Sequence, residues 1–184
     1  MQNYTDDILS ELSQSIQKID KNELSDFLEQ INRANHIFLT GAGRSGIAVQ
    51  AFANRLMHLG FSVSLVGEIS SPHSKAGDLL IICSGSGETS SLKSLAAKAQ
   101  QSEIKIALVT MKKSSTLAQQ ADAVLILPGN AKGEAINNET AFSQPMGSAF
   151  EQLAFLTFDS LVLNLMDETG ETSETMFKRH ADFE

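Results

Sequence analysis

The stretch FLTGAGRSG, residues 38–46, places glycines in the order G-x-G-x-x-G directly after a short apolar run. Glycines in this order let the chain turn tightly from a strand into a helix, and they let a phosphate approach the backbone. The stretch therefore predicts a strand–loop–helix unit of the α/β class. It leaves three alternatives open for the loop itself: a dinucleotide site, a site for a simpler phosphate, or a turn without a ligand.

Short apolar runs recur along the chain, and helical stretches separate several of them. This alternation predicts a five-stranded parallel sheet with crossover helices on both faces, a three-layer doubly wound sandwich. Ligands of such sheets bind at the carboxyl ends of the strands. The expected strands are residues 36–40, 62–66, 79–83, 104–109 and 123–127, and the expected crossover helices are residues 45–59, 88–101 and 114–121.

The segments outside the sheet core have patterns of their own. Apolar side chains at helical spacing predict two N-terminal helices with a break near residues 20–22. Residues 148–166 are apolar around most of the helix circumference, so we expect burial on several sides, including against another subunit. A last helix is expected near residues 172–179. We expect one domain, 1–184, with an N-terminal helical segment 1–34, a core sheet 35–128, a loop 129–147, and C-terminal helices and tail 148–184.

Composition narrows the classes of function. With 42% hydrophobic and 20% charged residues, the chain resembles an ordinary globular protein. Its net charge of −8 argues against a nucleic-acid or anionic-membrane partner, because both need a positive surface. No unbroken apolar run reaches the ~18 residues that cross a bilayer, and the polar first residues are not a secretory signal. A single cysteine, Cys83, excludes an internal disulfide and suits a cytoplasmic protein.

A second glycine loop, CSGSGETSS at residues 83–91, follows the third expected strand. Its glycines let several backbone N–H groups point at one anion, and the start of the next helix adds N–H groups with partial positive charge. A helix N-cap needs one hydroxyl, whereas this loop supplies three. The loop therefore predicts a compact phosphate site. Its candidate binding residues are Ser84, Gly85, Ser86, Gly87, Glu88 and Thr89.

The first loop then becomes a second wall of the same crevice. Gly43 and Ser45 are expected to contact the ligand, and Arg44 either pairs with an anion or a neighbouring chain or is a solvated residue. The N–H of Glu88 can contact the anion, while its carboxylate is expected to point away from phosphate. A dinucleotide is the weaker alternative: Glu68 lies where a ribose-binding acid is expected, but such a domain would take most of the 184 residues.

The two loops resemble the sugar isomerase (SIS) domain family, which binds phosphosugars on a five-stranded parallel sheet of flavodoxin-like strand order. FSQPMGSAFEQ, residues 142–152, and the terminal RHADFE are similar to its 6-phospho-3-hexuloisomerase members, and the similarity covers essentially the whole chain. The ending departs slightly from the RHANLE-like form of those members. The resemblance implies conversion of D-arabino-hex-3-ulose 6-phosphate to fructose 6-phosphate in the ribulose monophosphate pathway of formaldehyde fixation, a homotetramer, and no organic cofactor.

This isomerisation removes a proton from C2, passes through an enediol and returns a proton to C3, while a second group moves a proton between O2 and O3. The resemblance implies that Glu151 is the base, with its pKa raised by an apolar helix start; a surface glutamate at a helix start is the alternative. It also implies that His180 is the acid/base partner, in its own or a neighbouring subunit, rather than a disordered tail residue. His73 is a weaker candidate.

Other reactive side chains receive plainer interpretations. Cys83 and the methionines, including Met146, are expected to be packing residues. No cluster of histidine, cysteine and carboxylate residues at ligand spacing predicts a metal site. Two further alternatives to the hexulose isomerase stay open: an isomerase for another phosphosugar, and a non-catalytic module that senses a phosphosugar.

Overall fold

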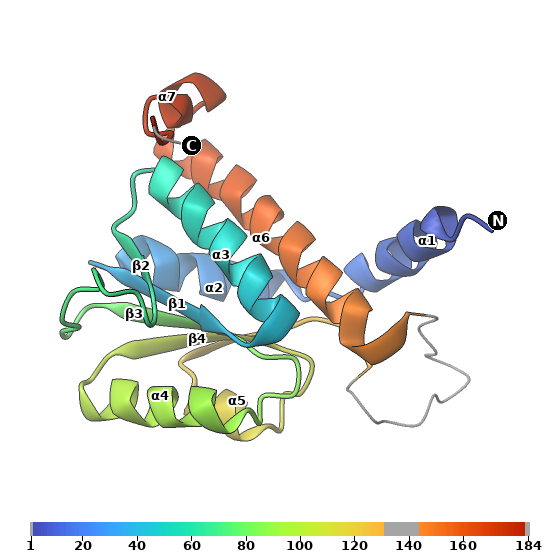
Figure 1. Cartoon of the computed structure of the whole chain (residues 1–184), viewed down its shortest axis with the longest axis horizontal. Helices are drawn as coiled ribbons and strands as arrows, with labels where there is room; N and C mark the ends of the chain where they lie inside the picture. The colour runs from blue at the N-terminus through green and yellow to red at the C-terminus, as the bar shows by residue number, and fades with distance from the viewer. Residues whose placement is uncertain (1, 131–143, 183–184) are drawn as a thin grey trace.

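The computed structural model describes residues 2–130 and 144–182. Its five strands form one sheet in the order β2-β1-β3-β4-β5, and every neighbouring pair is parallel (Figure 1). The doubly wound sheet predicted from the sequence is therefore confirmed. The strands are β1 (Ile37–Gly41), β2 (Val63–Leu65), β3 (Leu79–Cys83), β4 (Lys105–Thr110) and β5 (Ala123–Ile126).

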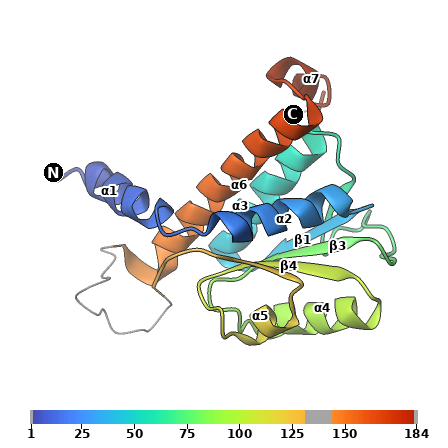
Figure 2. The same ribbon diagram turned by 180° about the vertical axis from the view of Figure 1, so that it is seen from behind.

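Helices cover both faces of the sheet and complete three layers (Figures 1 and 2). Side chains alternate between the faces of a strand, so Leu39 and Ile81 join one hydrophobic core and Ile82 joins the other. The first core includes α2 (Lys21–Arg33), α3 (Gly43–His58) and α6 (Ser148–Thr169), and the second includes α4 (Ser90–Gln101) and α5 (Thr116–Gln120).

Three shorter elements lie around α6. Helix α1 (Thr5–Ile16) stands beside the first turns of α6, away from the sheet, and buries Leu12 there (Figure 2). The 3₁₀ turn η1 (Pro145–Gly147) leads directly into α6. Helix α7 (Ser173–Phe177) follows the opposite end of α6 (Figure 1).

Most element boundaries agree with the sequence patterns, and the differences have local causes. Strand β2 has three residues because it is an edge strand that pairs only with β1, and its side chains are half-buried. The helix expected from residue 88 begins at Ser90, since the residues before it form the glycine loop. Helix α6 continues to Thr169, where Gly170 ends it with a left-handed conformation of φ 69°.

The position of helix α6 in the fold explains why it is so apolar. The segment Pro145–Thr169 is long and apolar enough to cross a membrane by length and composition, which the unbroken apolar runs did not indicate. One side packs on α3, where the rings of Phe52 and Phe158 stack with centroids 4.5 Å apart. Another side leaves Phe155 and Leu163 exposed. Burial in the core thus accounts for half of the segment, and the exposed side is addressed below.

The loop between β3 and α4 is packed tightly against the start of α5. Gly87 has a φ of +63°, and a Cβ on it would lie 2.1 Å from the Ser115 hydroxyl oxygen. That oxygen accepts a hydrogen bond from the Ala118 N–H at 3.3 Å and so caps α5. Gly170 has a similar φ of +69°, but nothing lies within 4 Å of its missing Cβ.

These two glycines give a matched test of the loop packing. Gly170→Ala is expected to lower the free energy of unfolding by about 1–2 kcal/mol, the cost of a left-handed alanine. Gly87→Ala carries the same cost and adds about 1–3 kcal/mol, because the new methyl group must displace Ser115. Urea unfolding of both variants measures the difference. Equal losses of unfolding free energy in the two variants would show that the loop accommodates the methyl group without an energetic cost.

Candidate functional site

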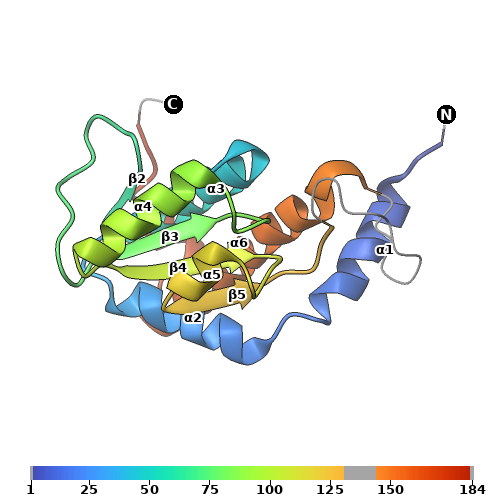
Figure 3. The same ribbon diagram turned by 90° about the horizontal axis from the view of Figure 1, so that it is seen from below.

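A cavity of about 460 Å³ lies at the carboxyl ends of β1 and β3. These strands are neighbours, and the last residue of β1, Gly41, pairs in register with the last residue of β3, Cys83. The two glycine loops therefore start side by side, and they face the start of α6 (Figure 3). The volume is within the roughly 300–1,000 Å³ of small-molecule sites. The predicted site residues that line the cavity are Gly43, Ser45, Ser84, Gly85, Ser86, Thr89 and Glu151.

The second loop presents unpaired donors to this cavity. In the described part of the chain, the backbone N–H groups of Gly85, Ser86 and Thr89 have no hydrogen-bond acceptor. Thr89 is the N-cap residue of α4, but its side chain makes no capping bond. Helix capping therefore does not account for the three hydroxyls of the loop. Clustered N–H groups and hydroxyls without a formal charge are the donors with which proteins hold phosphate.

The first loop owes two of its glycines to close packing. A Cβ on Gly46 would lie 2.8 Å from the Gly41 carbonyl oxygen, and a Cβ on Gly41 would lie 3.0 Å from the Gly46 backbone. Only glycine lets α3 start this close to β1. The fingerprint is thus explained without a dinucleotide. Glu68, the candidate ribose-binding acid, accepts a hydrogen bond from the Leu65 N–H at 3.3 Å and does not line the cavity.

The carboxylate of Glu88 points away from the cavity, as expected. It accepts hydrogen bonds from the Thr116 N–H at 2.6 Å and the Thr116 hydroxyl at 2.9 Å, and it pairs with Lys93 at 3.0 Å. The Thr116 N–H, Lys93 and the Thr116 hydroxyl lower the pKa of Glu88 to about 2. The Glu88 N–H contacts the Ser86 hydroxyl at 3.2 Å. Neither Glu88 nor Gly87 lines the cavity. Both residues hold the loop on the side that faces away from the cavity.

Glu151 enters the cavity from the first turn of α6. The preceding turn requires left-handed backbone at Met146, φ 57°, and Gly147, φ 82°. A left-handed conformation is costly for a methionine, and such strain gathers at functional sites. Met146 is 70% exposed and lines the cavity, so its assignment as a packing residue is wrong.

The Glu151 side chain is 11% exposed, and its Oε2 atom is buried. Arg44 Nε lies 2.5 Å from this oxygen, but the contact lacks hydrogen-bond alignment, and Oε2 accepts no hydrogen bond from the described residues. Arg44 reaches Glu151 from an apolar groove outside the cavity and does not line the cavity itself. A carboxylate that borders a ligand-sized cavity is positioned to take a proton from a bound ligand.

Cys83 lies beneath the cavity as an unreactive thiol. It is fully buried, and burial, reinforced by the Glu151 carboxylate and opposed by a hydrogen bond with Ser45, raises its pKa to about 12. A thiol with this pKa is protonated at neutral pH and is not a nucleophile. The interpretation of Cys83 as a packing residue is consistent with this environment.

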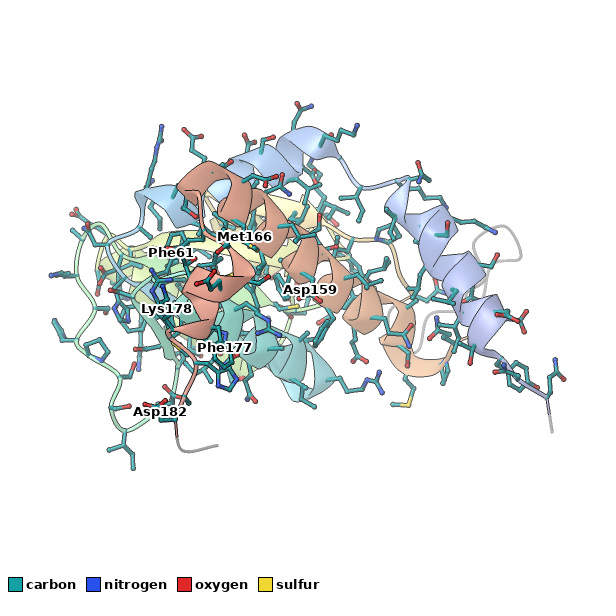
Figure 4. The ribbon with its side chains drawn as sticks, turned by 90° about the horizontal axis from the view of Figure 1, so that it is seen from above. Phe61, Asp159, Met166, Phe177, Lys178 and Asp182 are labelled. Carbon is teal, nitrogen blue, oxygen red and sulfur yellow. The ribbon has the colours of Figure 1, made fainter. Side chains whose placement is uncertain are left out.

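His180 lies at the other end of α6 from Glu151. It lines a separate hollow of about 420 Å³ that includes Met166. Because a helix rises about 1.5 Å per residue, Met166 and Glu151 are roughly 22 Å apart. The structure thus does not bring His180 to Glu151 within one chain. Figure 4 labels three residues around this hollow: Asp159, Met166 and Phe177.

The segment that carries His180 is anchored. Arg179 donates a hydrogen bond to the His58 carbonyl at 2.9 Å and pairs with both carboxylate oxygens of Glu171, at 2.9 and 2.8 Å. The rings of His180 and His58 stack with centroids 5.3 Å apart. His180 is thus exposed and lies against His58.

Among the residues that line the cavity and that sequence reasoning missed are Met111, Lys112 and Phe150. Met111 and Lys112 directly follow β4, and their position at a strand end was the available signal. His73 does not line the cavity. Among residues 2–130 and 144–182, no three histidine, cysteine or carboxylate side chains converge as a metal site would require.

Comparisons with known proteins agree with this geometry. The SIS domain model matches residues 30–156. The 3-hexulose-6-phosphate isomerase of Bacillus subtilis is 44% identical over 181 residues, 98% of this chain and 97% of that protein. The protein of the same name from Methylomonas aminofaciens is 35% identical over the full length of both chains.

A solved structure extends the comparison. A Methanococcus jannaschii protein, whose crystal structure was described as inferring a function of 3-hexulose-6-phosphate isomerase, matches with a TM-score of 0.82 and 30% identity. The match covers 97% of this chain and 96% of that one. The chain therefore belongs to the SIS domain family, and its full-length relatives place it among the isomerases of that family.

Proposed function

We propose that this isomerase interconverts D-arabino-hex-3-ulose 6-phosphate and fructose 6-phosphate. In this proposal the 6-phosphate binds the N–H groups and hydroxyls of residues 84–89, and the first loop forms the facing wall. The named relatives support the substrate. The observation that carries the chemistry is the buried Glu151 Oε2, which accepts no hydrogen bond from the described residues and borders the cavity.

The reaction needs a base that can reach two neighbouring carbons on one face of the substrate. The Glu151 carboxylate takes the proton from C2, the electrons form an enediol, and the same group returns a proton to C3 or C2 according to direction. Arg44 Nε lies 2.5 Å from the Glu151 Oε2 atom and forms an ion pair with this carboxylate. The side chain is nearly covered, so the proton it carries is sheltered from water.

Replacement of Glu151 separates catalysis from binding. Glu151→Gln keeps the shape of the side chain but removes the base, so kcat is expected to fall by about 10²–10⁴-fold while phosphosugar affinity changes little. The assay generates the hexulose phosphate from formaldehyde and ribulose 5-phosphate and follows fructose 6-phosphate formation. Glu29→Gln, which alters a surface ion pair with Arg33 on α2, is the matched control.

The same assay decides between the alternatives. Native turnover by Glu151→Gln would remove Glu151 from the mechanism. Binding of the phosphosugar without turnover in the unmodified protein would favour a sensing module. Turnover of a different phosphosugar would keep the site and change the substrate.

We further propose that the chain assembles into a homotetramer, as the resemblance implies. We also propose that it is cytoplasmic, which its single cysteine suits. An apolar groove of about 500 Å³ lies between α1, α3 and α6 and ends at Arg44 and Glu151. Exposed apolar side chains surround it or continue along α6, and burying them against a second copy would be favourable. They are Leu9, Ile47, Phe155, Leu156 and Leu163.

In such an assembly, His180 of one copy can serve the cavity of another. Its exposed position far from the Glu151 of its own chain supports this arrangement. His180 would then move the proton between O2 and O3 while Glu151 acts at carbon.

Mixing two inactive variants tests the shared site. Glu151→Gln and His180→Gln are each expected to be inactive alone. Co-expressed at equal levels, they are expected to recover about a quarter of native turnover, because random assembly leaves that share of sites with both native groups. No recovery would place both residues in one chain. Native activity of His180→Gln alone would remove His180 from the mechanism, and light scattering reports the assembly state.

A further inference from the structure

The cavity carries one positively charged side chain among its described lining residues, that of Lys112. The chain has a net charge of −8, and the described lining also includes the acidic Glu151. The donors of the phosphate loop are neutral N–H groups and hydroxyls. A phosphate dianion bound there gains from a cation within reach, because the nearby carboxylate repels it.

Two other cations near the loops lie outside the cavity. Arg44 contacts Glu151 from the neighbouring groove, and Lys93 lies 3.0 Å from Glu88 on the outer side of the loop. Neither residue lines the cavity. The position of Lys112 in the lining therefore distinguishes it from both.

Hydrogen bonds fix the backbone of Lys112 relative to the phosphate loop. The Met111 N–H donates to the Gly85 carbonyl at 3.0 Å, and the Thr110 hydroxyl donates to the same carbonyl at 3.1 Å. The Thr110 hydroxyl in turn accepts from the Lys112 N–H at 3.3 Å. Thr110 is fully buried, so these contacts are shielded from water. These bonds hold the Lys112 backbone beside the phosphate loop.

We propose that the Lys112 ammonium pairs with the phosphate of the bound sugar phosphate and sets its affinity. The inference rests on the proposed function in placing phosphate at residues 84–89. A lysine suits this role because its charge sits on a flexible stem and carries several donors, so it can follow a phosphate without a fixed geometry. Lys112 acts on binding and has no part in proton transfer, which belongs to Glu151.

The adjacent lysine provides a matched control. Lys113 is 81% exposed, lies 3.5 Å from Glu23, and does not line the cavity. Lys112→Met is expected to raise the KM and the inhibition constant of inorganic phosphate by about ten- to a hundredfold, the effect of losing a charged hydrogen bond. The kcat is expected to stay within about twofold, since the lost contact serves ground and transition states alike. Lys113→Met is expected to change none of these, and Lys112→Arg to restore most of the affinity.

Salt dependence and direct binding complete the test. Inhibition by phosphate is expected to weaken less steeply with added salt in Lys112→Met than in the native protein. Native KM and phosphate inhibition in Lys112→Met, or equal losses in both methionine variants, would overturn the proposal. If the native protein forms no fructose 6-phosphate, the proposed function fails. Calorimetry with inorganic phosphate on the native, Lys112→Met and Lys113→Met proteins then still decides the role of Lys112.

Discussion

The parallel pairing of β1 with β3 is the constraint on which the rest of the site depends. It sets Gly41 opposite Cys83, so two loops separated by about forty residues of chain begin at adjacent points of one sheet edge. Because the strand order changes direction there, the crossover helices leave to opposite faces and the edge stays open between them. The start of α6 closes the third side with Glu151. Strand pairing thus sets two walls of the cavity, and the packing of α6 on α3 sets the third.

The glycines have different structural roles in the two loops. Gly41 and Gly46 let β1 and α3 approach closely. Gly87 fits the second loop against Ser115 and leaves its neighbours free to present N–H groups. The same fingerprint is therefore compatible with dinucleotide and phosphosugar folds, because its glycines are needed first for the packing of the strand against the helix. The second loop distinguishes the two classes.

Two glutamates near the cavity have opposite roles because of their surroundings. Glu88 is held by Thr116 and Lys93, its pKa is about 2, and it stabilises the loop from behind. Glu151 is nearly covered, and its Oε2 atom accepts no hydrogen bond from the described residues. Hydrogen bonds from Thr116 and the contact with Lys93 turn the first carboxylate away from the cavity, whereas the second borders the cavity beside Arg44.

The sequence alone determined the parallel sheet, both glycine loops and the apolar α6, because periodicity and glycine spacing are local properties. It also predicted that the Glu88 carboxylate points away from the phosphate, since like charges repel. Only the tertiary structure showed that Arg44 contacts Glu151, that Met146 lines the cavity, and that His180 lies at the far end of α6. Likewise, only the placement of β4 beside β3 showed that Lys112 lines the cavity. Such contacts join residues distant in sequence, and no local pattern encodes where separate elements meet.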